Sequence, residues 1–203
     1  MSDRNRSVLL VTALLTVTVA GCASTTPGQA SPTTAPGTAS SAAPAATGIS
    51  LPARPKDLSF SGIDPCKILT QAQQTQLNIN RTRPHNPVPP LNERGCSYLV
   101  DAQKPNYTFV ITPSTKTGVQ DFLRQIDTSK STVFSAAGFP AVQNPVPIGV
   151  VPSCFGEVDV APGQMLFIQM ALDTPQGLTM DEMCAKLQQS AALAMTTLQQ
   201  GNG

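Results

Sequence analysis

The stretch CFGEVDVAPGQMLFIQMA, residues 154–171, decides the fold of this 203-residue chain. Residues 154–160 put apolar side chains or glycine at even-numbered positions and carboxylates at two odd-numbered ones. That alternation predicts a strand with one buried face and one solvent face. Residues 164–171 are largely apolar on both faces, which predicts a central strand. Pro162 and Gly163 separate the two segments, so we expect a hairpin turn between them.

A long amphipathic helix is expected after this hairpin. Thr179 and Glu182 have the spacing of a capping box, in which each side chain binds the backbone N–H of the other residue. Apolar residues then recur at helical spacing, so this is the longest helix that the sequence predicts. The residues of its apolar face are Met180, Met183, Cys184, Leu187, Ala191, Ala194 and Leu198.

The earlier part of the chain predicts two more helices and further strands. Asp64 is a good N-cap, and Pro65 suits the first position of a helix that we expect to continue to Leu77. A second capping box, Thr117 with Gln120, predicts the next helix. The expected strands are residues 96–100 and 107–111, joined by a turn at 104–106, and a short edge strand within 133–142.

The expected elements follow the order α-β-β-α-β-β-β-α. Strict alternation of strand and helix would indicate a parallel sheet, and this order is different. We therefore expect an α+β domain, with an antiparallel or mixed sheet of about five strands packed with three helices. Residues 81–94 contain four prolines and are expected to form a long loop before the first strand.

The N-terminal region predicts export and lipidation. Arg4 and Arg6 precede an apolar run over residues 8–20, which is shorter than the roughly 20 residues that span a bilayer. Val19-Ala20-Gly21-Cys22 then has the form of a lipobox, so we expect residues 1–21 to be removed as a signal peptide and Cys22 to carry a diacylglyceride. The alternative is an ordinary secretory signal that leaves Cys22 as a spare thiol.

A tether of residues 22–57 is expected between the lipid and the folded domain, which we expect to cover residues 58–203. Residues 23–48 are built from Ala, Thr, Ser, Pro, Gly and one Gln, without charge and without an apolar group larger than Ala. Such a segment buries too little surface to offset the entropy lost on ordering. Its Thr-Pro-rich runs also resemble O-glycosylated stalks, although a bare spacer is the simpler interpretation.

The cysteine count agrees with lipidation. The chain has five cysteines, and assigning Cys22 to lipid leaves four, which allow three disulfide pairings. We prefer the pairing of Cys66 with Cys96 and of Cys154 with Cys184, because it would hold each terminal helix against a strand. The two crossed pairings remain the alternatives.

Charge and motifs exclude several function classes. Removing residues 1–21 leaves eleven basic and eleven acidic residues, and a neutral domain lacks the basic face that nucleic acid requires. A single histidine, no C-x-x-C pair and no Gly-rich phosphate loop predict no metal and no cofactor. Glu157 and Asp159 are the carboxylates that an envelope enzyme would use, but we expect both on the solvent face of their strand.

Several local motifs together resemble a known family. They are the lipobox, the Thr/Pro/Ala tether, Asp64-Pro65-Cys66 with Leu69-Thr70, Gly95-Cys96-x-Tyr98, Gly138-Phe139-Pro140-Ala141, Cys154 on a strand and Cys184-x-x-Leu187 on the last helix. They look like an actinobacterial family of envelope lipoproteins of unknown function that includes mycobacterial lipoproteins. The family often has Trp where this chain has Tyr98. The resemblance implies an extracytoplasmic place at the cell membrane, a single α+β domain with two disulfides, and no catalytic residues.

The best candidate for a contact surface is the segment from residue 81 to residue 94. It is long, and it carries Arg81, Arg83, His85 and Arg94. Long loops on rigid scaffolds often carry recognition. The alternative is a variable insertion without a role, with His85 solvated.

Three functions remain open. The first is a non-catalytic binding or scaffolding module of the envelope, held at the membrane by its lipid and contacting an unknown envelope protein or ligand. The second is a carrier or sensor with an apolar pocket between sheet and helices, for which the methionines would provide plastic walls or would simply fill the core. The third is a carboxylate-dependent envelope enzyme, which is the least favoured.

Overall fold

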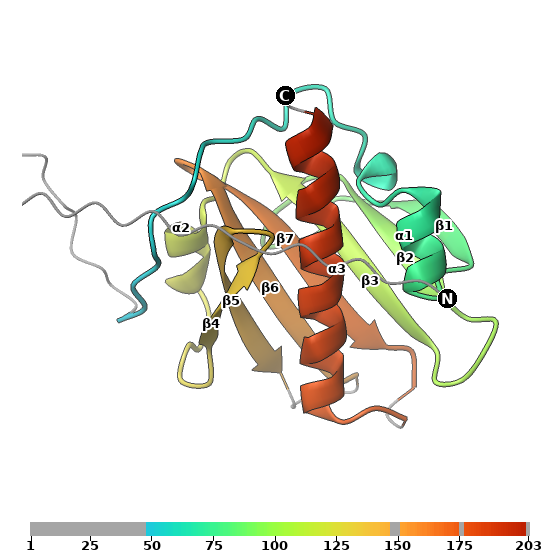
Figure 1. Cartoon of the computed structure of the whole chain (residues 1–203). Coiled ribbons are helices and arrows are strands. Elements are labelled where there is room, and N and C mark those ends of the chain that lie inside the picture. The colour runs from blue at the N-terminus through green and yellow to red at the C-terminus, as the bar shows by residue number, and fades with distance from the viewer. Residues whose placement is uncertain (1–47, 147–150, 175–176, 202–203) are drawn as a thin grey trace, which may run out of the picture. The chain divides into compact units, whose positions relative to one another are not determined.

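The structure is a computed structural model that describes residues 48–146, 151–174 and 177–201. The predicted signal peptide, lipobox and most of the tether lie outside these ranges. Seven antiparallel strands form one sheet in the order β1-β2-β3-β7-β6-β5-β4, with helices on both faces (Figure 1). The predicted α+β class is therefore confirmed, and the sheet has seven strands where about five were expected.

The elements have the following bounds. They are a 3₁₀ turn η1 (Pro65–Lys67), α1 (Gln71–Gln76), β1 (Arg81–His85), β2 (Gly95–Val100), β3 (Tyr107–Ser114), α2 (Val119–Leu123), β4 (Thr132–Ala136), β5 (Phe139–Val146), β6 (Ser153–Ala161), β7 (Gln164–Leu172) and α3 (Met180–Gly201). The hairpin predicted at Pro162 and Gly163 is confirmed as the connection between β6 and β7. β7 is the middle strand of the sheet, as its apolar faces predict.

The long helix α3 covers one face of the sheet. Its capping box is confirmed, because Glu182 N donates to Thr179 Oγ1 at 3.3 Å and Thr179 N donates to Glu182 Oε2 at 2.8 Å. Gly156 on β6 lets this helix approach closely, since a Cβ there would lie 2.5 Å from Leu187 Cδ2. Below it lies the main core, which contains Tyr98, Phe109, Ile111, Val158, Ile168, Met183, Leu187 and Met195.

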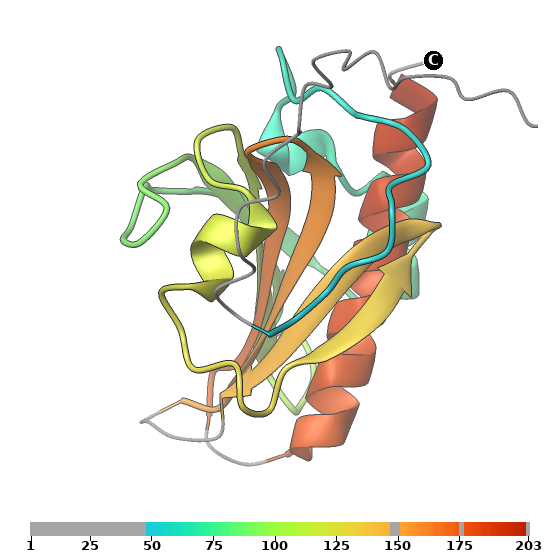
Figure 2. The ribbon, with the colours of Figure 1, turned by 90° about the vertical axis from the view of Figure 1, so that its left-hand side faces the viewer.

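A second, smaller core lies on the other face of the sheet, under α2. Figure 2 shows α2 and α3 on opposite sides of the sheet. Val119, Phe122 and Leu123 of α2 pack on Val142, Met165 and Phe167 of the sheet. Ile49 and Leu51, which precede the expected start of the domain at Leu58, pack against the same cluster. Both faces of the sheet are therefore covered, although the α2 face has only a five-residue helix and irregular segments as its cover.

This second core corrects the expectation for Glu157. The side chain was expected in solvent, but its residue is fully buried, because α2 and the N-terminal segment cover the odd-numbered side of β6. Glu157 Oε2 accepts a hydrogen bond from Asn144 Nδ2 at 2.5 Å, and Asn144 Oδ1 accepts one from Ser131. Among the described residues Glu157 Oε1 is the buried side-chain N or O atom without a hydrogen-bond partner. Burial raises its pKa well above the usual value, against the opposing effect of the Asn144 bond.

Two strand predictions were wrong. Residues 81–85, expected in a loop, form the edge strand β1, which pairs with β2 from Arg81 opposite Leu99 to His85 opposite Gly95. The single strand expected within residues 133–142 is the hairpin of β4 and β5. Ala137 and Gly138 both have positive φ values, +49° and +91°, and this pair forms the tight turn between the two strands.

Two helix predictions also need correction. Asp64 does cap a turn at Pro65, accepting from Cys66 N at 3.0 Å, but that turn is 3₁₀ and ends at Lys67. The helix starts again at Gln71, with a capping box that Thr70 makes with Gln73. The N-cap of α2 is Gly118, without a side-chain cap, so the capping box expected from Thr117 and Gln120 is absent.

The preferred disulfide pairing is confirmed. Cys66 is joined to Cys96, and Cys154 is joined to Cys184, each over a separation of 30 residues. The first bond holds η1 against the start of β2. The second holds the first turns of α3 against the start of β6. Cys154 and Cys184 are both buried, whereas Cys66 is only partly buried.

We predict that removing either disulfide destabilises the domain, and that the second bond matters more. Closing a loop of about 30 residues contributes roughly 3.5 kcal/mol by the chain-entropy model. Replacing both Cys154 and Cys184 by Ala also removes buried packing, so it should cost more than replacing Cys66 and Cys96. Urea unfolding of the two double variants measures the difference. A larger loss of stability in the variant without Cys66 and Cys96 would contradict the prediction.

We predict that Glu157 makes the domain less stable as the pH rises above about 4.5. In the unfolded chain the carboxyl has its ordinary pKa of about 4.5 and releases its proton there, whereas the folded state keeps the proton. The folded state then binds more protons, so the free energy of unfolding falls with pH until the folded carboxyl ionises, by at most about 1.4 kcal/mol per pH unit. Glu157→Gln should remove this fall, because an amide does not ionise. The amide oxygen can still accept the hydrogen bond from Asn144, so the local packing is kept.

Urea unfolding at a series of pH values tests this, with Glu182→Gln as the control. Hydrogen bonds from Thr179 lower the pKa of Glu182, so the contribution of Glu182 to stability appears above the unfolded pKa and is lost in acid. The control should therefore change the pH dependence in the opposite direction. An unchanged dependence in Glu157→Gln would show that the buried carboxyl is not its source.

Candidate functional site

The α2 face of the sheet contains several cavities. One, which we call the aromatic pocket, has a volume of about 170 Å³ and lies under the loop of residues 86–94. A second, the adjoining cleft, has a volume of about 360 Å³ and shares Ile126 and Phe155 with the first. A third, the strap pocket, has a volume of about 430 Å³ and lies beside residues 49–54. A further cavity of about 310 Å³ lies elsewhere, between residues 61–68 and the last turns of α3.

The walls of the aromatic pocket come from four parts of the chain. Strands β3, β6 and β7 supply its floor, α2 and the residues after it supply one side, and the loop 86–94 supplies the roof. Its apolar lining includes Leu91, Val110, Phe122, Ile126, Phe155 and Phe167. An apolar concavity with a few polar groups is the usual form of a small-ligand site.

The roof of the aromatic pocket is attached at its C-terminal end through Glu93. Its carboxylate accepts from Ser114 Oγ at 2.6 Å, and from Thr115 N and Thr115 Oγ1 at 2.9 Å each. These hydrogen bonds lower the pKa of Glu93 despite its partial burial, so the carboxylate stays ionised at neutral pH. Gly95 then brings β2 close to β3, since a Cβ there would lie 2.8 Å from Ile111 O.

The N-terminal end of the roof begins at His85. Its Nδ1 lies 3.1 Å from the Oγ atom of Ser97, a buried residue on β2. Burial, and to a smaller extent the charge of Arg83, lower the pKa of His85, so the imidazole is neutral at pH 7. His85 also lines the aromatic pocket. The loop is therefore hydrogen-bonded to the scaffold at both ends, and the pocket beneath it is preformed.

The predicted contact residues do not gather at one place. His85 is the member of the set that lines the aromatic pocket. Arg81 forms an ion pair with Asp101 at the far end of β1. Arg83 and Arg94 are exposed and line none of the four cavities. Arg81, Arg83 and His85 alternate along β1 and share one of its faces, so the set is spread along the strand, from the Asp101 ion pair at one end to the aromatic pocket at the other.

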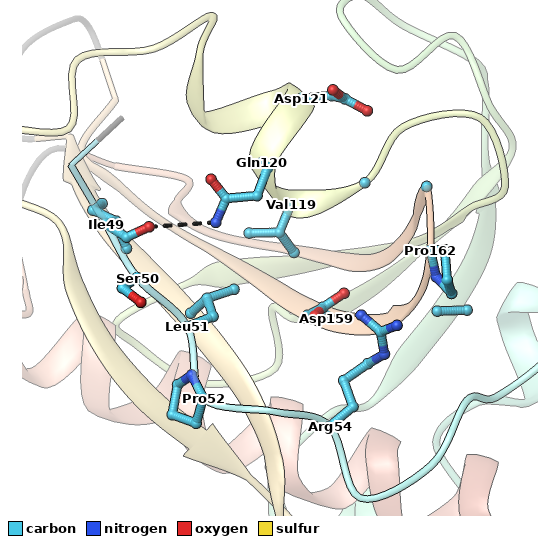
Figure 3. Close-up of a pocket in the computed structure, with 13 residues that line it drawn as sticks. Ile49, Ser50, Leu51, Pro52, Arg54, Val119, Gln120, Asp121, Asp159 and Pro162 are labelled. Atoms are coloured by element: carbon cyan, nitrogen blue, oxygen red, sulfur yellow. Dashed lines mark hydrogen bonds and ion pairs between the residues drawn. The ribbon is translucent and has the colours of Figure 1, made fainter. Parts of the chain in front are cut away.

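The strap pocket lies where the N-terminal segment crosses the sheet (Figure 3). Arg54 Nη1 lies 2.6 Å from Asp159 Oδ2, and Leu58 N donates to Val160 O at 2.9 Å. Gln120 Nε2 of α2 donates to Ile49 O at 3.4 Å. Burial raises the pKa of Asp159, and the Arg54 contacts oppose that rise. These contacts hold residues 49–58 against β6 and α2.

Glu157 and Asp159, the two carboxylates that an enzyme would use, have different surroundings. They lie two residues apart on β6, a spacing of roughly 7 Å along a strand. Glu157 is fully buried and lines none of the four cavities, while Asp159 is held by Arg54 at the strap pocket. Within the described residues no group of three or more His, Cys, Asp or Glu side chains is placed to hold a metal ion.

Four of the described methionines fill cores, and none of the four lines a cavity named above. Met170, Met183 and Met195 are buried under α3, and Met165 is buried in the second core. The pocket-forming signal that the sequence analysis missed is the pair Phe155 and Phe167. Both occupy the odd-numbered face of their strands, together with Glu157, and two phenylalanines on one face indicate that the face is covered.

Comparisons with known proteins identify a family. Searches of the curated proteins and of the solved structures find no match to this chain. A family model described as "Protein of unknown function (DUF3558)" matches residues 17–197. None of the described helices is long and apolar enough to cross a membrane. Because the match covers most of the chain and includes all four disulfide-bonded cysteines, the chain belongs to the DUF3558 family of proteins of unknown function.

Proposed function

We propose that this protein is a non-catalytic binding module of the cell envelope, anchored by a lipid on Cys22 and binding its partner or ligand through the α2 face. The observation that carries the proposal is the preformed aromatic pocket, whose roof is hydrogen-bonded to the scaffold at both ends. A preformed site loses less conformational entropy on binding than a flexible surface does. Two disulfides support an extracytoplasmic location, because they persist in oxidising compartments.

The surface around the aromatic pocket supports a binding role. Val88 in the roof is 50% exposed although it lines the pocket, so a bound partner or ligand would cover apolar surface there. The adjoining cleft extends the apolar surface past Phe155 toward Pro145 and Val146, with Lys130 at its margin. Contiguous apolar surface with a polar margin is a common feature of interaction sites.

A carrier or sensor of small apolar molecules is the second candidate. The aromatic pocket and the adjoining cleft meet at Ile126 and Phe155, and the cleft alone has a volume of about 360 Å³. That volume is within the roughly 300–1,000 Å³ of small-molecule sites. The carrier site is then on the α2 face, and it does not involve the methionine-rich core under α3.

We predict that a photoreactive amino acid at position 88 crosslinks to a specific partner or ligand on intact cells. The matched control is the same amino acid at position 189, because Gln189 is also exposed but lies on α3, which covers the other face of the sheet. Gel shifts and mass spectrometry identify the products. Identical products at both positions, or none at position 88, would count against binding through the α2 face.

We predict that Cys22→Ala abolishes lipid anchoring. Without the thiol the diacylglyceride has no attachment point, and residues 23–48 have no apolar group larger than Ala that could hold the membrane. The variant should be found unprocessed or in the soluble fraction, whereas Ser24→Ala should behave as the wild type. Membrane fractionation and the intact mass of the protein decide, and normal processing with membrane retention would overturn the anchor.

A further inference from the structure

The aromatic pocket collects an unusual share of the chain's aromatic rings. Three of the seven phenylalanines, Phe122, Phe155 and Phe167, line it. The ring centroids of Phe122 and Phe155 lie 5.3 Å and 5.7 Å from that of Phe167, and the rings are tilted by 57° and 42°. Tilted rings present both faces and edges, and an aromatic guest gains from edge-to-face and offset contacts beyond its buried area. These walls favour a planar ring over a purely aliphatic guest.

The size of the pocket limits the guest to about one ring. Its volume is about 170 Å³. A protein cavity of about 150 Å³ lined by Leu, Ile and Phe holds a benzene molecule. The aromatic pocket therefore accommodates one six-membered ring with a small substituent, and a larger molecule would have to extend past Phe155 into the adjoining cleft.

The polar groups of the pocket favour a hydroxyl substituent on that ring. The imidazole of His85 uses Nδ1 to bond Ser97, so Nε2 is the ring nitrogen that remains for a ligand. Thr112 also lines the pocket. A hydroxyl both donates and accepts, so it pairs with Nε2 in either neutral tautomer. A carbonyl or a carboxylate would pair with only one tautomer.

The charges in the pocket also favour a neutral guest such as a phenol. Glu93 lines the pocket and is ionised, because Ser114 and Thr115 hold its carboxylate and lower its pKa. His85 is neutral, because burial and Arg83 lower its pKa. No Lys or Arg side chain lines the pocket among the described residues, and Arg83 and Lys116 act on His85 and Glu93 from outside it, so an anionic guest would meet the Glu93 carboxylate without a cation in the pocket wall. A neutral guest avoids that repulsion.

We propose that the aromatic pocket binds a single phenol-type ring, with its hydroxyl at His85 and its ring among Phe122, Phe155 and Phe167. The ring belongs either to a free phenolic molecule or to a tyrosine side chain of a partner. This assignment rests on the proposed function, because it names the ligand chemistry of the same α2 face.

Titration of the full mature domain with p-cresol and with toluene tests the ligand chemistry. Two-dimensional NMR should show saturable shifts of the residues that line the aromatic pocket, together with NOEs from p-cresol ring protons to Phe155 and Phe167. The two probes differ by one hydroxyl, and a hydrogen bond of about 1 kcal/mol makes p-cresol bind roughly fivefold to tenfold tighter. His85→Phe should reduce that ratio to about one. Absence of p-cresol NOEs to the two phenylalanines, or an unchanged ratio in His85→Phe, would overturn the assignment.

Filling variants provide a second, independent measurement. Val110→Phe and Leu91→Trp add bulk at two walls of the pocket and should abolish the p-cresol shifts. Val133→Phe is the matched control, because it makes the same change on the half-exposed β4 surface and should bind as the wild type. Unchanged p-cresol shifts in a folded filling variant would overturn the site. If neither filling variant folds, the wild-type NOEs alone decide.

A third titration, with N-acetyltyrosinamide, distinguishes the two sources of the ring. Shifts of the same residues, as strong as those of p-cresol, assign the pocket to a tyrosine side chain, and their absence beside clear p-cresol binding assigns it to a free phenol. Both outcomes support the ring chemistry. Crosslinking from position 88 without any p-cresol binding would leave the α2 face as the binding surface and remove only the phenol assignment.

Discussion

The contact between α3 and β6 is the constraint on which the rest of the structure depends. The Cys154–Cys184 disulfide joins the start of the strand to the start of the helix. Two residues later, Gly156 has no side chain where Leu187 approaches. The helix then fixes which face of β6 is buried in the main core, because a one-residue slip would turn every side chain of the strand over. Val158 and Val160 therefore lie under α3, and Phe155, Glu157 and Asp159 face the other way.

Because α3 packs on one face of the sheet, the opposite face, which we call the α2 face, has a thinner cover. A 22-residue helix with a continuous apolar stripe packs densely on one side of the sheet. The other side receives a five-residue helix, the segment of residues 49–58 and the proline-rich loop 86–94, whose packing leaves cavities between them. This face also holds the buried carboxyl of Glu157, which a fully apolar core would exclude. The cover is strong enough to desolvate a carboxyl, yet it is not dense enough to fill the space beside Phe155.

Local patterns predicted much of the fold, and the errors have physical causes. The capping box at Thr179, the hairpin at Gly163 and the apolar face of α3 are contacts within a few residues, so the sequence displays them directly. Strand β1 was missed because four prolines in residues 81–94 masked a short edge strand whose hydrogen bonds come only from β2. Glu157 was misplaced because its burial depends on α2 and Ile49, which are far from it in sequence. The expectation that residues 164–171 are buried on both faces already implied that the neighbouring strand β6 is covered as well.

The candidate site was predictable only in part, for the same reason. His85 attracted attention as the sole histidine, and it does line a pocket, but its role depends on Ser97 and on the roof that Glu93 holds. His85 and Ser97 are 12 residues apart in sequence, and Glu93 and Thr115 are 22 apart, so no local motif joins either pair. The arginines of the same segment were grouped with His85 by proximity in sequence, but none of them lines the pocket, because β1 spreads Arg81 and Arg83 along the strand and Arg94 lies beyond the roof.

The path of the chain into the domain links the proposed anchor to the proposed site. Residues 49–54 are the first packed part of the chain, and they lie on the α2 face rather than on the α3 face. If residues 22–48 form the tether that their composition predicts, its average reach would be roughly 26–31 Å. The first packed residues of the chain lie on the face that carries the pockets, so the proposed anchor on Cys22 would keep that face near the membrane surface. With this anchor, a ligand in or near the membrane would meet the α2 face while the domain stays anchored. A tether that entered on the α3 side would instead place α3 between the membrane and the α2 face.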